Sequence, residues 1–404
     1  MPLQKVSRIA SMRGLVFPLL FALSTFGVAQ QYQQTNLVSD IQGLAPTPDS
    51  NLLNPWGLIS SPTSPWWVSD NNGGVSTLYD GNTGLIMPLV VNIPPIATDP
   101  KNKPKGTGTP TGVVFTGASG FTFHAKNAQG QDTMAGAVFT FVTEDGTIVA
   151  WGPGINPNDP NDLPNDAFVV VDNSKNPTAQ KGAVYKGATI AQMKAGGPFF
   201  LYVTNLRSGR IEVYDTKFKL ADLDDADNDH DDQAFTDREL PSGFAPFNVQ
   251  EVNGNLYVTY AKQNASKHDD FDFPGLGFVD KFSPTGKLLQ RLEQGPWLNA
   301  PWGVAIAPAN FGFFSNHLLI GNAGSGQIAV YDAKSGRFDG LLRDANGHAI
   351  QNDRLWALRF GNDNGAGPSN WLFFTAGISG EAHGLFGFFT PGDKSASENN
   401  GDDQ

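Results

Sequence analysis

A short motif of proline, an aromatic residue and a small residue returns along this chain. Asn54–Ile59 reads Asn-Pro-Trp-Gly-Leu-Ile, Ala300–Ala305 reads Ala-Pro-Trp-Gly-Val-Ala, and Ala245–Val249 reads Ala-Pro-Phe-Asn-Val. A weaker copy, Thr109–Val114, reads Thr-Pro-Thr-Gly-Val-Val. Motifs that recur at intervals of several tens of residues indicate a repeat architecture. A chain of 404 residues exceeds the usual size of a single core, so a repeat fold is a way to keep it in one domain.

Each copy is followed by short runs of β-favouring residues with turn signals between them. In the first unit we expect strands at Trp56–Ser60, Trp66–Ser69, Val75–Tyr79 and Leu85–Val91. The connections carry glycine, proline, asparagine and aspartate, which suit tight turns between antiparallel strands. Four short antiparallel strands form one blade of a β-propeller.

Six such units begin near Asn54, Thr109, Lys186, Ala245, Ala300 and Arg354. A further strand around Thr35–Ile41 belongs to no unit, and we expect it to pair with the last blade and close the ring. The stretch Ala188–Lys194 is the best helix candidate in a chain without clean helical periodicity. The predicted fold is all-β: a six-bladed β-propeller of four-stranded antiparallel blades, forming a single domain over residues 30–391.

The two ends of the chain differ in composition from the repeats. Lys5, Arg8 and Arg13 precede an apolar run, and small residues follow up to Ala29. This pattern predicts a signal peptide over residues 1–29, cleaved after Ala29, and hence a secreted protein, extracellular or periplasmic. No later segment has the ~20 apolar residues that a membrane span needs. Residues 392–404 are polar and acidic, and we expect a disordered tail there.

The charge balance and the absence of cysteine exclude several function classes. Lys and Arg total 27 against 39 Asp and Glu, a formal charge of −12, which disfavours binding to the phosphates of nucleic acid. With no cysteine there is no disulfide, thiolate metal site or cysteine nucleophile. The partners that we expect for a monomer of this kind are a small molecule, a carbohydrate or an extracellular protein.

Several stretches resemble known propeller families. Asn322–Asp332 and Pro301–Ala305 are similar to NHL repeats, in which a Pro-Gly-Val/Ile-Ala start leads to an Ile-x-Val-Tyr/Phe-Asp strand. With Leu240–Gln250 and Leu256–Ala261, the chain resembles a family of uncharacterised secreted bacterial propellers over nearly all of its mature length. This resemblance implies six blades and export, and it implies no activity.

Propeller topology places the start of each first strand and the end of each second strand at the same mouth of the central channel. The second-strand ends carry Asp70, Glu144, Asn205, Tyr260, Asn322 and Ala376. The first-strand starts carry Trp56, Phe247, Trp302 and Trp356. We therefore expect polar groups inside a ring of aromatic side chains, which is a common composition for a ligand site.

Oxygen donors occur at four of these turns: Asp70, Glu144, Asn205 and Asn322. Such donors suit Ca²⁺, and they also suit hydrogen bonds to the backbone of their own turn. The aromatic side chains, Tyr260 included, either stack on a ligand such as a sugar ring or pack between blades. The chain is more distantly similar to calcium-dependent lactonase-like propellers, whose channel metal is held by Glu, Asn and Asp. Asn54 stands where that pattern has a glutamate.

Two acidic segments lie outside the strands that recur in each unit. Asp222–Asp232 alternates aspartates as the start of an EF-hand loop does, but His230 replaces the required glycine and Thr236 the bidentate glutamate. It is a solvated acidic loop or a loose Ca²⁺ site. The insertion Ala261–Leu276 contains His268, Asp269 and Asp270, and we expect it to overhang the same mouth.

These patterns leave two hypotheses for function. The first is a binding protein that uses one mouth of the channel for a ligand or a partner. The second is a Ca²⁺-dependent hydrolase of the lactonase or esterase type, in which Glu381 or His383 serves as the base. The sequence has no G-x-S-x-G, P-loop or H-E-x-x-H motif that would decide between them.

Overall fold

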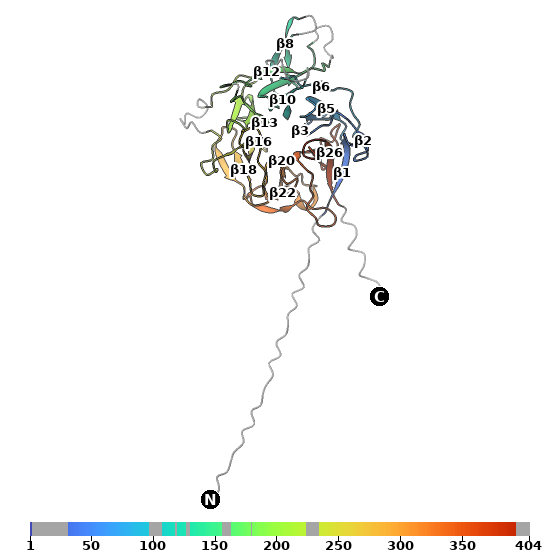
Figure 1. Cartoon of the computed structure of the whole chain (residues 1–404), viewed down its shortest axis with the longest axis vertical. Helices are drawn as coiled ribbons and strands as arrows, with labels where there is room; N and C mark the ends of the chain where they lie inside the picture. The colour runs from blue at the N-terminus through green and yellow to red at the C-terminus, as the bar shows by residue number, and fades with distance from the viewer. Residues whose placement is uncertain are drawn as a thin grey trace.

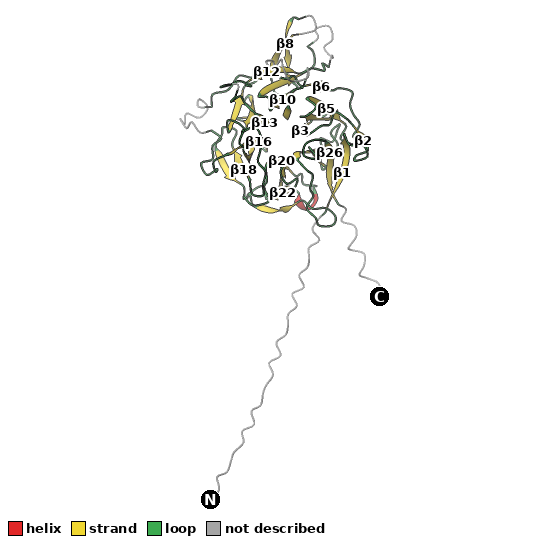
Figure 2. Ribbon diagram, in the orientation of Figure 1, coloured by secondary structure: helices red, strands yellow, loops and turns green. Residues whose placement is uncertain are grey.

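The computed structural model describes Met1 and residues 31–96, 107–117, 119–126, 130–155, 163–178, 180–223 and 234–392. These residues form short β-strands and turns, with a single 3₁₀ turn, η1, at Gly312–Phe314. Six small antiparallel sheets stand around a central axis, which confirms the predicted six-bladed propeller (Figures 1 and 2). Residues 2–29 of the predicted signal peptide and residues 393–404 of the predicted tail lie outside the described residues.

The blades follow the repeats in chain order, from the innermost strand outward. Blade one contains β3 (Pro55–Ile59), β4 (Trp66–Asp70), β5 (Val75–Tyr79) and β6 (Val91–Asn92). Blade two contains β7 (Pro110–Phe115), β10 (Phe139–Thr143), β11 (Thr147–Trp151) and β12 (Phe168–Asp172). Blade three contains β13 (Tyr185–Gln192), β14 (Phe199–Asn205) and β15 (Arg210–Tyr214).

The second half of the ring repeats the same order. Blade four contains β16 (Phe244–Val252), β17 (Asn255–Lys262), β18 (Gly277–Phe282) and β19 (Leu288–Arg291). Blade five contains β20 (Pro301–Ile306), β21 (Leu318–Asn322), β22 (Ile328–Tyr331) and β23 (Phe338–Leu341). Blade six contains β24 (Leu355–Phe360), β25 (Leu372–Ala376), β26 (Leu385–Pro391), β1 (Tyr32–Ser39) and, parallel to β1, β2 (Thr47–Pro48). A separate hairpin of β8 (Thr122–Lys126) and β9 (Asp132–Gly136) stands out from blade two.

The N-terminal strand closes the ring, as the sequence predicted. β1 pairs antiparallel with β26, from Tyr32 opposite Pro391 to Ser39 opposite Leu385. The Tyr32 hydroxyl also donates a hydrogen bond of 3.0 Å to the carbonyl of Phe311, which ties the strand to blade five. Because β1 pairs with the edge of β26, that edge is not free to pair with a strand of another chain.

Three details of the strand prediction are wrong. Ala188–Lys194 is not a helix, because residues 188–192 pair with β14 as the inner strand of blade three. Blade three has three strands in the described part of the chain, extended only by a bridge between Tyr214 and Leu220. The fourth strand of blade one is reduced to β6, since Pro88 interrupts the run Leu85–Val91 and has no N–H to donate.

The glycine of the repeated motif is there because the inner strands approach one another closely. A β-carbon on Gly57 would lie 2.5 Å from the carbonyl oxygen of Thr111, and one on Gly303 would lie 2.6 Å from that of Trp356. A threonine on the second strand of a blade also links neighbouring blades. The hydroxyl of Thr375 in blade six donates a hydrogen bond of 2.7 Å to the carbonyl of Trp56 in blade one. These contacts fix the residue before each glycine on the channel axis.

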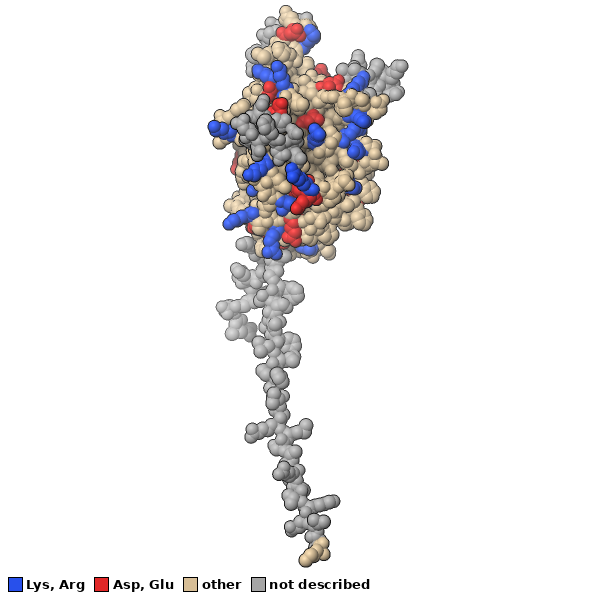
Figure 3. Space-filling view, turned by 90° about the vertical axis from the view of Figure 1, so that its left-hand side faces the viewer, with Lys and Arg blue, Asp and Glu red and all other residues tan. Residues whose placement is uncertain are grey.

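The surface at the rim of the disc carries side chains of both charges (Figure 3). On the side shown in Figure 3, basic and acidic side chains are interspersed between uncharged ones. Among the described residues, no helix has the length and apolar character needed to cross a membrane.

Candidate functional site

The aromatic residues of the repeated motif fill the channel. Trp56 stacks on Trp356 with ring centroids 3.5 Å apart and meets Phe247 and Trp302 edge-on at 6.1 Å. All four side chains are at most 4% exposed. We call these four residues the aromatic plug. Tyr260 is also buried, inside blade four. The predicted contact of these five side chains with a ligand stays a prediction, and their observed role is packing.

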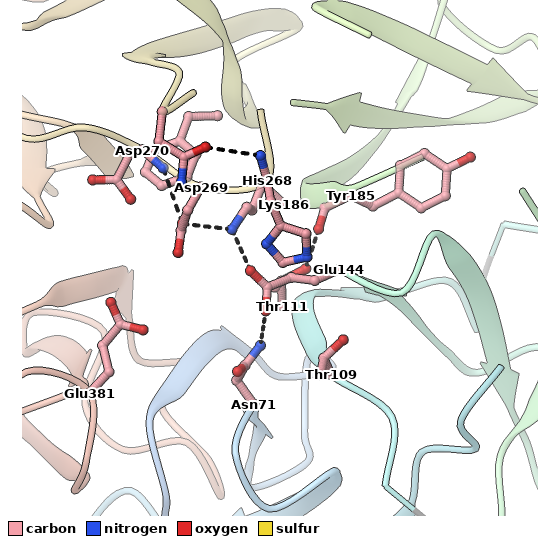
Figure 4. Close-up of polar contacts among 12 residues, drawn as sticks. Asn71, Thr109, Thr111, Glu144, Tyr185, Lys186, His268, Asp269, Asp270 and Glu381 are labelled. Carbon is pink, nitrogen blue, oxygen red and sulfur yellow. Dashed lines mark hydrogen bonds and ion pairs between the residues drawn. The ribbon is translucent and has the colours of Figure 1, made fainter. Parts of the chain in front are cut away.

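A buried lysine lies on the plug, at the start of β13. The Nζ atom of Lys186 is 4.7 Å from the ring centroid of Trp56, and the side chain is fully buried. Nζ forms ion pairs with Glu144 and, at 3.0 Å, with Asp269 (Figure 4). Burial alone would lower the pKa of Lys186, but the charges of both carboxylates and the hydrogen bonds to them raise it above its ordinary value. The two ion pairs therefore favour the ammonium form of Lys186 at neutral pH.

Around Lys186 lies a network that we call the mouth cluster: Glu144, Lys186, Asp269, Asp270, Asp272, Arg354 and Glu381. The insertion Ala261–Leu276 supplies its three aspartates, so the insertion does reach over the mouth. Arg354 contacts Asp270 at 3.2 Å and Glu381 at 3.2 Å, and so joins blades four and six. Burial raises the pKa of Asp270 to about 7 against the opposing charge of Arg354.

Asn54 connects the plug to the mouth cluster. Its backbone φ of 46° is matched by Ala300 and Arg354, which occupy the same place before β20 and β24. The Asn54 side-chain oxygen accepts a hydrogen bond of 3.1 Å from Trp356 Nε1, and its Nδ2 donates 3.1 Å to Glu381. A glutamate here would have no N–H for Glu381 and would add a repelling charge. The departure from the lactonase-like pattern thus has a structural reason.

The four predicted calcium ligands have different surroundings. Asp70 accepts hydrogen bonds from the backbone N–H and the hydroxyl of Thr77 in its own blade. Asn205 donates a hydrogen bond of 2.7 Å to Glu212, and Asn322 accepts one of 2.8 Å from the backbone N–H of Asn299. Glu144 belongs to the mouth cluster, where Asn71 donates 2.9 Å to it. The structure therefore brings one of the four to Lys186, and the calcium site stays a prediction.

Asp70 provides a test of these surroundings. Burial raises the pKa of its carboxyl well above the ordinary value, with help from the charge of Asp49, and its Oδ1 has no partner in the described chain. The folded protein thus keeps a proton that the unfolded chain releases above pH ~4, so stability falls as pH rises towards the folded pKa. We expect Asp70→Asn to raise the Tm, increasingly from pH 4 to pH 8. The exposed Asp132→Asn should show no such trend, and a Tm difference that shrinks with pH would contradict the assignment.

The two predicted bases lie apart in their contacts. Glu381 belongs to the mouth cluster, and burial raises its pKa while Arg354 opposes that shift. His383 forms a hydrogen bond with Asp40, the residue that follows β1, and its Nδ1 lies 2.6 Å from Oδ2 of Asp40. The structure therefore does not join them as one acid–base pair. Most of the run Asp222–Asp232 lies outside the described residues.

Sequence reasoning missed Lys186, the residue at the centre of the cluster. The inner strands align Trp56, Thr111, Phe247, Trp302 and Trp356 at one position before the small residue. Lys186 occupies that position in β13. A charged residue at a position otherwise filled by channel-facing side chains was the signal available in the sequence.

The architecture and this site define a six-bladed propeller with a closed channel and a charged mouth. No protein-family model matches the chain. It is similar to uncharacterized proteins of Acanthamoeba polyphaga mimivirus. One is 32% identical over 214 residues, 53% of this chain and 36% of that protein, so the chain spans about a third of its length. A second is 27% identical over 326 residues, 80% of this chain and 77% of that protein.

The chain also aligns over most of its length with solved structures of enzymes. A glucose dehydrogenase aligns with 89% of this chain and 99% of its own, at 14% identity and a TM-score of 0.47. A streptogramin B lyase aligns with 89% and 97%, at 12% identity and a TM-score of 0.46. At these values the likeness says nothing about activity, and the propeller assignment rests on the order of the sheets.

Proposed function

We propose that the protein is a non-catalytic binding propeller that holds a cationic group of a ligand or partner at its mouth. The observation that carries the proposal is the charge of the mouth cluster. It contains five carboxylates, from Glu144, Asp269, Asp270, Asp272 and Glu381, and two cations, Lys186 and Arg354. A cleft of one sign of charge concentrates ligands of the opposite sign.

The exposure of the carboxylates supports the same proposal. The side chains of Asp269, Asp272 and Glu381 are 41%, 37% and 27% exposed, whereas Asp270 is 2% exposed. The outer carboxylates thus meet solvent while the inner ion pairs hold the loop and the blades in place. The plug lies beneath Lys186, so a ligand would rest at the mouth and would not pass through the channel.

A metal-dependent hydrolase is the second candidate, because one set of donors favours it. Glu144, His268 and Asp269 each offer a ligand atom, and these atoms lie within 4.8 Å of one another. Carboxylate and imidazole donors together suit transition metals, and carboxylates alone suit Ca²⁺. The ammonium of Lys186 already contacts two of the three side chains, so a metal would have to compete with it.

The binding proposal predicts a salt-sensitive affinity for amines. We expect putrescine and lysine amide to bind to the full chain in calorimetry, and succinate not to bind. Neutralising the outer carboxylates with Asp272→Asn and Glu381→Gln should weaken binding about tenfold, because each screened ion pair contributes up to ~1 kcal/mol. Asp132→Asn, on the outlying hairpin, is the matched control. Equal binding of amine and succinate, or no effect of the double variant, would contradict the proposal.

Metal-binding measurements on the same protein distinguish the hydrolase hypothesis from the binding hypothesis. Stoichiometric binding of Ca²⁺, Mn²⁺ or Zn²⁺ that is lost in Glu144→Gln would favour the metal site over amine capture. Unchanged melting in EDTA, together with no metal uptake, would remove it. Export, predicted from residues 1–29, remains a separate proposal, tested by whether the cleaved chain begins at residue 30.

A further inference from the structure

Beyond the plug, the channel holds a small cavity whose one charged lining residue is a cation, Arg359. Its volume is about 10 Å³, enough for one water-sized species. Residues of all six inner strands line it, among them Gly57, Gly112, Ala188, Gln250, Trp302 and Arg359. These strands surround the axis of the disc in Figure 1. The cavity is therefore a property of the whole ring and not of one loop.

The residues that line this cavity include a cation and a tryptophan with an indole N–H that is unpaired in the part of the chain that the structure describes. The Nε of Arg359 donates 3.3 Å to the carbonyl of Leu58, and within the described chain no carboxylate forms an ion pair with its guanidinium. Trp302 is one of the lining residues, and its indole N–H is buried with no hydrogen-bond partner among the described residues. None of the lining side chains is acidic. A buried donor such as this indole N–H is costly unless something accepts its hydrogen bond.

The charge of Arg359 is only weakly compensated by the protein. Burial lowers the pKa of its guanidinium to about 10, and the charge of Glu251, on the inner strand of blade four, opposes this shift. Glu251 uses its own Oε1 to accept 2.6 Å from the backbone N–H of Gly254. At neutral pH Arg359 therefore remains a cation facing a cavity that lacks a counter-charge.

We propose that this end of the channel binds a small monovalent anion, a halide ion such as chloride, between Arg359 and the plug. The ion would enter from the partly exposed Arg359 side, because the aromatic plug closes the other side. It would accept hydrogen bonds from the guanidinium and lie next to the unpaired indole of Trp302. The site is separate from the mouth cluster, so it does not depend on the proposed binding of cations.

Chloride should stabilise the protein at constant ionic strength. We expect the Tm of the full chain to rise by about 2 °C when 0.2 M sodium gluconate is replaced by sodium chloride, through preferential binding to the folded state. Arg359→Met should lose this response, and Arg359→Lys should keep part of it. Arg337→Met changes an exposed arginine on blade five and should respond as the parent does.

Crystals soaked in bromide give a second measurement that needs no variant. An anomalous peak in the cavity, within hydrogen-bond distance of Arg359, is the expected result. A water molecule there in the presence of bromide, or a chloride response that survives in Arg359→Met, would overturn the proposal. Bromide found only on the outer surface would count as an adventitious ion only, and would overturn it equally.

Discussion

Replacing Lys186 with methionine will lower the free energy of unfolding by about 3 kcal/mol, at the lower end of the effect of removing one partner from a buried ion pair. The methylene stem can still pack on Trp56, but the carboxylates of Glu144 and Asp269 lose their common cation. Asp269 is partly exposed and recovers solvation, so most of the loss falls on Glu144. Denaturant unfolding at pH 7 measures the difference.

Two companion variants make this result specific. Lys194→Met, an exposed lysine on the same blade, should change stability by less than about 0.5 kcal/mol. Adding Glu144→Gln to Lys186→Met should restore part of the loss, because the unpaired charge is then absent. Without the lysine, Glu144, His268 and Asp269 are also free to take a metal, so Mn²⁺ should raise the Tm of Lys186→Met more than that of the parent. A Lys186→Met protein as stable as the parent would show that these ion pairs do not hold the mouth.

The blade count was predictable because it depends on local signals. The copies at Asn54–Ile59 and Ala300–Ala305 mark inner strands, and the turns between strands have recognisable chemistry. The closing strand followed by elimination, since a strand at Thr35–Ile41 without a unit of its own had one free edge to meet. Blade three departed from the prediction at residues 188–192, which pair with β14, because local propensity does not report an interaction between two segments.

The candidate site was predictable in place but not in composition. Topology correctly brought Glu144, Glu381 and the insertion Ala261–Leu276 to one mouth. It could not show that the side chain of Asp70 points into its own blade towards Thr77. A shift of one residue along a strand moves a side chain to the opposite face, and the sequence does not fix the end of a strand to one residue. Nor could it show that the aromatic side chains touch across the axis, since that depends on the width and tilt of the ring. The contacts of Lys186 depend on the packing of the plug beneath it, which the sequence does not report.

Replacing Trp56 with alanine will destabilise the protein by about 4 kcal/mol, in the range for removing a large buried aromatic side chain. Trp56 has the most central contacts of the plug: it stacks on Trp356, meets Phe247 and Trp302 edge-on, and carries Lys186 on its face. The cavity cannot collapse easily, because the glycines of adjacent inner strands already hold the backbones in contact. Trp56→Phe should lose less than half as much, and Phe313→Ala, at a 64% exposed side chain, should be nearly neutral.

The same variant tests whether the plug separates the two ends of the channel. The mouth has an excess of carboxylates, and the cavity beyond the plug has Arg359 without an ion-pair partner in the described chain. With Trp56 removed, water can connect the two ends, and the ammonium of Lys186 no longer has an aromatic floor. The stabilisation of Trp56→Ala by chloride should then fall below that of the parent, because a hydrated channel screens Arg359. A Trp56→Ala protein with the stability and the chloride response of the parent would show that the plug is neither the core of the ring nor its barrier.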